Sequence, residues 1–269
     1  MRILFCGDIV GRSGREAVAL HVPRLRRELA LDFVIANGEN AAGGFGLTLA
    51  IGESLFAAGV DAITGGNHTW DQKELVGTIE REPRILRPHN FPPGTPGRGA
   101  AVFNAPGGRK ILVVNLLGRV FMDAIDDPFQ AVEKELARQR LGGTVAAIVV
   151  DMHAEATSEK QAMAHALDGR VSLVVGSHSH VPTADAQILP GGTAFQTDAG
   201  MCGDYDSVIG MKKHVPILRF TRKLPTERLE PADGEATLCA VFLETDEETG
   251  KASRVAPVRQ GGRLAPAMP

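Results

Sequence analysis

The segment ILFCGD, residues 3–8, decides the fold, because four apolar residues run directly into Gly7 and Asp8. A short apolar run that ends in a polar turn is typical of a buried strand. Residues 15–29 follow with helical periodicity, which Pro23 is expected to bend or break. A strand, a polar turn and a helix in this order predict an α/β fold in which helices cover a largely parallel sheet.

The same order recurs through most of the chain. Further strands are expected where short aliphatic runs occur, at residues 33–36, 62–64, 111–117, 146–150 and 173–175, and in a β-rich C-terminal part at residues 194–197, 238–244 and 254–258. Further helices are expected after an N-cap at Thr48, over residues 71–80, over residues 128–138, and through Ala166 after capping-box spacing between Ser158 and Gln161.

The remaining segments predict a loop, a turn and a tail. Residues 81–106 contain six prolines, which favours a loop or an excursion at a sheet edge. Residues 246–250 have the composition of a hairpin turn between the last two strands. We expect one domain over residues 1–260 and a frayed tail over residues 261–269.

The composition is that of an ordinary folded protein, and it narrows the class of ligand. Of the 269 residues, 43% are apolar and 23% are charged, which predicts a substantial buried core. The formal net charge of −3 offers no broad cationic surface, so a long nucleic acid is not expected as a partner. A small anionic molecule suits this charge better, and a homo-oligomer remains open.

Cysteine use and hydropathy indicate a cytoplasmic protein. Cys6, Cys202 and Cys239 show no paired spacing, which favours a reducing compartment over a disulfide framework or a structural zinc cluster. The N-terminal apolar run is too short for a secretory signal, and no stretch approaches the roughly 18 to 20 apolar residues that cross a bilayer. No membrane partner is therefore expected.

Five of the predicted strand ends carry side chains suited to binding metal ions. These residues are Asp8, Glu39, Asn40, Asn67, His68, His153, His178 and His180. The C-terminal ends of strands in an open α/β sheet meet at one rim, where ligand sites form. We therefore expect oxygen and imidazole ligands to gather there around two cations. Glu39 is the candidate bridge, because a shared carboxylate offsets the repulsion between the cations.

Each motif taken alone also has a plain structural interpretation. Asp8 could cap the next helix or bind a ribose, and Asn67 could simply turn the backbone before a helix. His153 could be a buried, hydrogen-bonded histidine, and the pair His178 and His180 could lie on a surface loop. The order and the spacing of the motifs together favour the metal site.

That order resembles the motif order of the calcineurin-like metallophosphoesterases. The chain has Asp, Glu-Asn, Gly-Asn-His, His and Gly-x-His-x-His in succession, where that family has Asp-x-His, Gly-Asp, Gly-Asn-His, His and Gly-His-x-His. The resemblance covers residue 2 to about residue 197, and it implies a layered αββα sandwich. The ligand sets that it implies are Asp8, Glu39, Asn40 and His180 for one metal, and Glu39, Asn67, His153 and His178 for the other. His68 matches the family's proton donor.

Two departures from the family pattern bear on the metals and on the substrate. Val10 stands where many members have a histidine, and Glu39 stands where they have a bridging aspartate. This Glu-Asn variant resembles a bacterial branch associated with hydrolysis of cyclic nucleotides, 2′,3′-cyclic or 3′,5′-cyclic. The resemblance therefore implies a small phosphodiester as substrate. An oxygen-rich set without thiolates favours iron or manganese, and zinc stays open.

The expected chemistry follows from electrostatics. Two cations lower the pKa of a shared water from about 15.7 towards about 7, which gives a hydroxide that attacks phosphorus near neutral pH. His68 would protonate the departing ribose oxygen, and Asp71, one helical turn later, would orient the His68 ring.

Two other functions remain as alternatives. The first is a nucleotide-binding regulator with little catalysis, whose mark would be tight binding of a cyclic nucleotide without product. The second is a two-metal amidohydrolase acting on C–N bonds. That class typically carries His-x-His on its first strand, whereas His178 and His180 come late in this chain.

Overall fold

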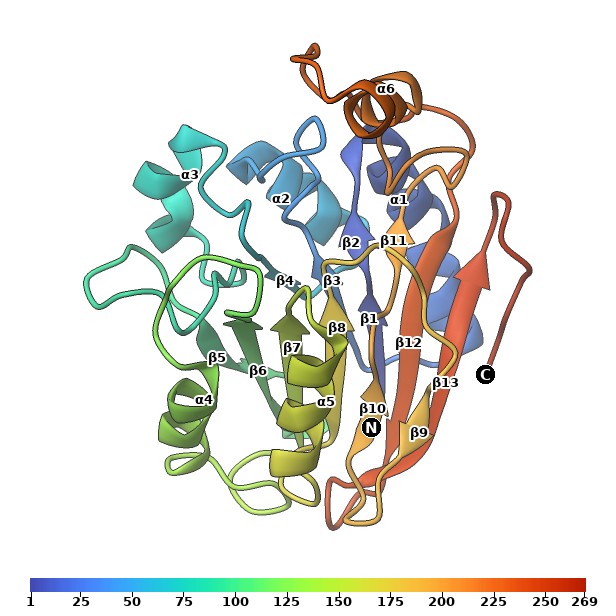
Figure 1. The fold of residues 1–269 in the computed structure, drawn as a ribbon. Coiled ribbons are helices and arrows are strands. Elements are labelled where there is room, and N and C mark those ends of the chain that lie inside the picture. The colour runs from blue at the N-terminus through green and yellow to red at the C-terminus, as the bar shows by residue number, and fades with distance from the viewer.

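The computed structural model describes residues 1–269 and divides them among thirteen strands, six α-helices and two short 3-10 helices (Figure 1). The strands are β1 (Arg2–Cys6), β2 (Asp8–Ile9), β3 (Phe33–Asn37), β4 (Ala62–Thr64), β5 (Ala100–Asn104), β6 (Lys110–Leu117), β7 (Ala147–His153), β8 (Leu173–Ser177), β9 (Gln187–Ile188), β10 (Ala194–Gln196), β11 (Met201–Cys202), β12 (Leu238–Thr245) and β13 (Ala252–Gln260). The helices are α1 (Gly11–Glu28), α2 (Leu49–Ala57), α3 (Lys73–Thr78), α4 (Pro128–Leu136), α5 (Thr157–Ala166) and α6 (His214–Arg222), with 3-10 turns at Ile79–Arg81 and Pro106–Gly108.

Two sheets pack face to face between two layers of helices (Figure 1). The first sheet has the strand order β13-β12-β1-β3-β4, and the second has the order β5-β6-β7-β8-β10-β9. One apolar cluster joins α1 and α2 to the first sheet, a second lies between the sheets, and a third joins α4 and α5 to the second sheet. These layers form the αββα sandwich that the sequence predicts.

Strand β1 shows why the opening apolar run decides the fold. Ile3 and Phe5 point into the cluster between the sheets, while Leu4 and Cys6 point towards the helices on the other side. Successive side chains of a strand face opposite ways, so a strand that is covered on both faces needs apolar residues at every position. All four of these side chains are fully buried.

The parallel strands bring their polar ends to one rim of the sandwich. In the first sheet β1, β3 and β4 run parallel, and in the second β6, β7, β8 and β10 run parallel. The arrowheads of β1 and β7 point to the same end of the molecule, the end that carries α6 (Figure 1). Residues that follow these strands are therefore brought close together.

Several predicted elements are confirmed. Thr48 accepts a hydrogen bond from the backbone N–H of Ile51 and caps α2. Pro128 occupies the first turn of α4. The hairpin turn after β12 closes through a hydrogen bond from the N–H of Gly250 to the carbonyl of Asp246.

Three helix predictions were wrong in detail. Helix α1 begins at Gly11 and continues through Pro23, because its buried apolar face packs on the first sheet and outweighs the hydrogen bond that proline cannot donate. The helix predicted over residues 71–80 is split into α3 and a 3-10 turn. Ser158 lies inside α5, which follows Ala156 without a side-chain cap, so the predicted capping box does not form.

Five strands and helices were not predicted. They are β2, β5, β9, β11 and α6. Strand β5 lies inside residues 81–106, where the prolines favour a loop or an excursion at a sheet edge, and it forms one edge of the second sheet. Strand β2 pairs with β11, and the backbone N–H of Asp8 donates to the carbonyl of Gly200 at 3.1 Å. This pairing fixes the backbone of Asp8 at the rim.

The C-terminal residues pair with the last strand. Residues 261–269, where a frayed tail is expected, turn back along β13, and Arg259 and Ala267 exchange two backbone hydrogen bonds. None of the helices is both long enough and apolar enough to cross a bilayer.

Candidate metal centre

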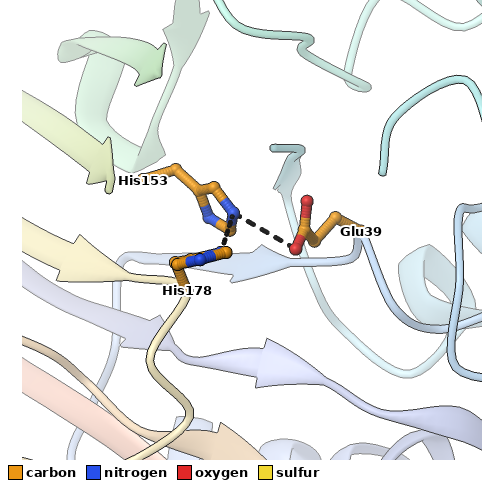
Figure 2. A group of neighbouring side chains, drawn as sticks. All are labelled: Glu39, His153 and His178. Carbon is orange, nitrogen blue, oxygen red and sulfur yellow. Dashed lines mark hydrogen bonds and ion pairs between the residues drawn. The ribbon is translucent and has the colours of Figure 1, made fainter. Parts of the chain in front are cut away.

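All eight residues singled out in the sequence lie at the rim where the two sheets meet. Glu39 follows β3, His153 ends β7 and His178 follows β8, and Figure 2 shows these three side chains turned towards one another. The Oε1 atom of Glu39 lies 3.1 Å from Nε2 of His153, and that Nε2 lies 3.1 Å from Nδ1 of His178. Glu39 and His153 are buried, and His178 is partly exposed. Distant parts of the chain thus converge on one carboxylate.

The first group of donor atoms is completed by Asn67. Its Oδ1 atom lies 3.0 Å from Nε2 of His153. The same nitrogen therefore faces a carboxylate oxygen of Glu39, an amide oxygen of Asn67 and an imidazole nitrogen of His178. One nitrogen cannot form a separate hydrogen bond with each of three neighbours, so the arrangement fits four donors directed at a cation.

The second group consists of Asp8, Asn40 and His180. Nε2 of His180 lies 3.2 Å from Oδ1 of Asn40 and 4.0 Å from Oδ1 of Asp8. The Asp8 carboxylate is fully buried, and its Oδ1 atom has no hydrogen-bond partner. A buried oxygen without a partner is costly, and a cation at this position would satisfy it.

The outward nitrogen of each histidine has a partner that leaves the inward nitrogen free for a metal. Nδ1 of His180 lies 2.8 Å from the carbonyl of Ile209, which can only accept, so the proton is on Nδ1. Nε2 of His178 lies 3.1 Å from Oε2 of Glu155. Partners of this kind set the tautomer of a metal-binding histidine and hold its ring.

His153 is oriented by a buried polar network. Its Nδ1 atom lies 2.8 Å from Oγ of Ser177, and that hydroxyl donates to Oδ1 of Asp151 at 2.6 Å. Since Ser177 has one proton, it accepts from His153 when it donates to Asp151. Asn37 and Thr64 also donate to Asp151, so this fully buried carboxylate joins both sheets beneath the site.

Electrostatics within the site favours a charged Glu39. Burial opposes its charge, but the neighbouring His153 ring lowers the pKa of Glu39 to about 2. Burial also opposes charge on His153, yet Glu39 and then Asp8 raise the pKa of His153 to about 9. Burial lowers the pKa of His178, with a contribution from His153, to about 3, and it lowers the pKa of His180 as well.

These shifts predict how metal affinity depends on pH. Below about pH 9 the metal-free protein holds a proton on His153 that must leave before both groups of donors are free, while His178 and His180 are already neutral and Glu39 is already ionised. The Kd for Mn²⁺ should therefore fall about tenfold per pH unit between pH 7 and pH 9 and then level off. Calorimetric titrations in buffers of different ionisation enthalpy should detect at least about one released proton per chain at pH 7, since burial also raises the pKa of Asp8 well above its usual range. An affinity that does not change with pH would contradict this.

Gly66 leaves the space that the ligands occupy. A Cβ atom at this position would lie 2.2 Å from Oε2 of Glu39 and 2.4 Å from Nε2 of His153. We expect Gly66→Ala to weaken Mn²⁺ binding at least about tenfold, because the added methyl displaces two donors at once. Gly77→Ala, in α3 with open space around its Cα, is the matched control and should leave Mn²⁺ binding unchanged. Equal Mn²⁺ affinity in the two variants would argue against the site.

His68 lies beside the carboxylate without being one of the converging donors. Its backbone N–H donates to Oε2 of Glu39 at 3.0 Å, while its ring Nδ1 lies 2.9 Å from Oδ2 of Asp71. The His68 ring also meets the edge of Phe45, with 5.1 Å between the ring centroids. Asp71 thus occupies the orienting position that the sequence predicts for it.

Sequence reasoning missed the residues that support the ligands. Glu155 contacts the ring of His178, and Ser177 contacts the ring of His153. Asp151 accepts a hydrogen bond from Ser177. Their one available signal was position, because Glu155 follows His153 by two residues and Ser177 immediately precedes His178. Nothing in the spacing identified the Ile209 carbonyl, because a backbone atom from a distant loop leaves no trace in residue type.

Comparisons with known proteins agree with this fold. A family model described as YmdB-like protein matches residues 4–258. A protein of Bacillus subtilis (strain 168), described as a 2′,3′-cyclic-nucleotide 2′-phosphodiesterase, is 48% identical to this chain over 95% of each of the two.

Two solved structures are similar over nearly their whole length. One, a hypothetical protein from Thermus thermophilus, has a TM-score of 0.91 and 44% identity and covers 98% of this chain and 100% of its own. The other, a novel phosphatase from Mycoplasma pneumoniae, has a TM-score of 0.89 and 34% identity over 97% and 93% of the two chains. The matches confirm the resemblance to metallophosphoesterases and the αββα sandwich.

Proposed function

We propose that this chain is a two-metal phosphodiesterase that hydrolyses 2′,3′-cyclic nucleotides. The chain belongs to the YmdB-like family, and the proposal starts from that membership. The observation that carries the proposal is the position of Glu39, whose two oxygens contact the ring of His153 and the backbone of His68. The relative from Bacillus subtilis, matched along almost its whole length, supports the choice of substrate.

The donor set fits two divalent ions. Asp8, Glu39, Asn40 and His180 would hold one ion, and Glu39, Asn67, His153 and His178 would hold the other. When bound, such ions activate a water molecule and offset the negative charge that develops on the phosphate. Nitrogen and oxygen donors without thiolate favour iron or manganese, and they do not exclude zinc.

His68 supplies the proton for the leaving group. Oδ2 of Asp71 accepts a hydrogen bond from Nδ1–H of His68, which leaves Nε2 of His68 as the nitrogen that transfers a proton to the substrate. The His68 side chain is 29% exposed, so a substrate can reach it. A new bond forms between phosphorus and an oxygen of water, which releases one proton to the solvent; the bond from phosphorus to the ribose 2′-oxygen breaks, and His68 protonates that oxygen. The product is a 3′-phosphate.

The cellular setting is part of the proposal. Cys6, Cys202 and Cys239 are free and buried, which suits a reducing compartment, and we place the protein in the cytoplasm. Residues 1–260 would form one catalytic domain, because its donors come from strands of both sheets. The partner would be a small phosphate ester.

A panel of cyclic nucleotides tests the function. Protein purified without chelators should contain two transition-metal ions per chain and convert 2′,3′-cyclic AMP to the 3′-nucleotide faster than it converts 3′,5′-cyclic AMP. Dialysis against a chelator should abolish turnover, and added Mn²⁺ or Fe²⁺ should restore it. Tight binding of cyclic AMP without product over hours would favour a regulator instead, and undiminished turnover by metal-free protein would eliminate the proposal.

A further inference from the structure

The turn that carries His178 and His180 has an unusual backbone. The φ angles are 95° at His178 and 64° at His180, both in the left-handed region that favours glycine. Non-glycine residues remain in that region only where the surrounding structure holds them there. Something outside the turn must therefore fix its conformation.

A buried ion pair lies against this turn. Lys160, on α5, is 1% exposed, and its Nζ donates to Oδ2 of Asp198 at 2.8 Å. Asp198 is fully buried. A Cβ on Gly176 would clash with the carbonyl of Thr197 and would lie 2.6 Å from Cδ of Lys160, so this glycine leaves room for both the Thr197 backbone and the lysine stem. A buried lysine is rare and costly unless it is paired, so the loss of either partner would leave an unpaired charge in the interior.

Asp198 connects the ion pair to two backbone segments of the metal centre, the turn of His178 and His180 and the segment at Asp8. Its Oδ2 accepts from the backbone N–H of Ser179 at 3.0 Å, in the middle of the strained turn. Its Oδ1 accepts from the N–H of Gly200 at 2.8 Å, and the carbonyl of Gly200 accepts from the N–H of Asp8 at 3.1 Å. The N–H of His178 in turn donates to Oδ2 of Asp8 at 3.1 Å, so the turn and Asp8 are also hydrogen-bonded to each other directly.

We propose that Lys160 and Asp198 are a positioning pair that holds the turn of His178 and His180 and the backbone of Asp8 in the conformation that binds metal. The inference rests on the proposed metal site, but it concerns residues outside the two groups of donors. Asp198 directs two backbone segments, and Lys160 supplies the charge that keeps Asp198 in a dry interior.

The main test measures Mn²⁺ binding by calorimetry, and turnover is a second readout. Asp198→Ala removes both acceptors, and we expect the Kd for Mn²⁺ to rise about 10- to 100-fold, the usual effect of losing a group that orients ligands. Asp198→Asn keeps one acceptor oxygen and should lose less affinity than Asp198→Ala. At saturating Mn²⁺ the kcat of each folded variant should be closer to the wild-type kcat than its Kd for Mn²⁺ is to the wild-type Kd, because the reacting groups are unchanged.

Asp168→Ala is the matched control. Asp168 also accepts from two backbone N–H groups, those of Gly191 and Thr193, but it lies before β8, at the end of that strand away from the site. This variant should lose thermal stability and keep wild-type affinity for Mn²⁺. Wild-type affinity in folded Asp198→Ala, or an equal loss in Asp168→Ala, would overturn the inference.

Hydrogen exchange of the wild-type protein tests the inference without a variant, in case Asp198→Ala does not fold. The amide of Ser179 lies in a partly exposed turn, yet its bond to Asp198 should slow its exchange at least about 100-fold relative to an unstructured amide. Exchange at the unstructured rate would overturn the inference. Neither measurement needs a substrate, so slow exchange and Mn²⁺ binding without hydrolysis would refute the proposed function and leave the positioning pair standing.

Discussion

Glu39→Gln is expected to lower kcat/KM for a 2′,3′-cyclic nucleotide at least about 1,000-fold, because the loss of several kcal/mol of charge stabilisation has that effect on a rate. The substitution keeps the shape of the side chain and removes its charge. That charge lies 3.1 Å from Nε2 of His153, and it is the candidate bridge between the two cations. Metal analysis should find fewer than two ions per chain.

The matched control is Glu82→Gln. Glu82 is also largely buried, and its Oε2 atom pairs with Arg84 at 2.6 Å, three residues before Ile85 bridges in parallel to Ile63 of β4. This variant should be less stable to heat and should bind two metals with unchanged turnover. If Glu39→Gln retains both metals and most of its activity, the two groups of donors do not share a carboxylate.

His68→Ala is expected to reduce kcat by about 100- to 10,000-fold on a cyclic nucleotide, the range associated with loss of a general acid. The effect should nearly vanish on bis-p-nitrophenyl phosphate, since p-nitrophenolate leaves without a proton. Metal content should not change, because the contact with Glu39 comes from the backbone N–H of residue 68 and survives the substitution.

Asp71→Asn refines the test of His68. Asp71 holds the ring of His68 at 2.9 Å and does not touch Glu39 in the structure, so its loss should reduce kcat less than His68→Ala while following the same dependence on the leaving group. Equal losses on both substrates, or loss of metal in His68→Ala, would place His68 among the ligands and remove it from proton transfer.

The fold could be predicted from the sequence because its signals are local. Four apolar residues in β1, each buried on one of two faces, specify a strand between layers. The positions of short elements could not be predicted. Strands β2 and β11 have two residues each and pair with one another in a separate sheet, so their register depends on tertiary contacts. The continuation of α1 through Pro23 is likewise a tertiary effect, since packing on a sheet offsets a local preference.

The candidate metal ligands could be predicted from the sequence, but the residues that hold them in place could not. A histidine at the end of an apolar run has several possible roles, and the order of several such strand ends along the chain favours a metal site. The polar groups beneath the ligands, such as Asp151, sit inside strands where their type suggests nothing about a metal. Lys160 is the clearest example, because a lysine on a helix is ordinarily a solvated side chain. Its burial against Asp198 follows only from the packing of α5.

The most direct test of the central claim is anomalous diffraction from crystals grown with Mn²⁺, collected at the manganese absorption edge. Two peaks per chain are expected, one among Glu39, Asn67, His153 and His178 and the other among Asp8, Glu39, Asn40 and His180, with the Glu39 carboxylate in contact with both. No peak near Glu39, or a single peak that leaves His180 and Asp8 without a metal, would contradict a shared two-metal centre.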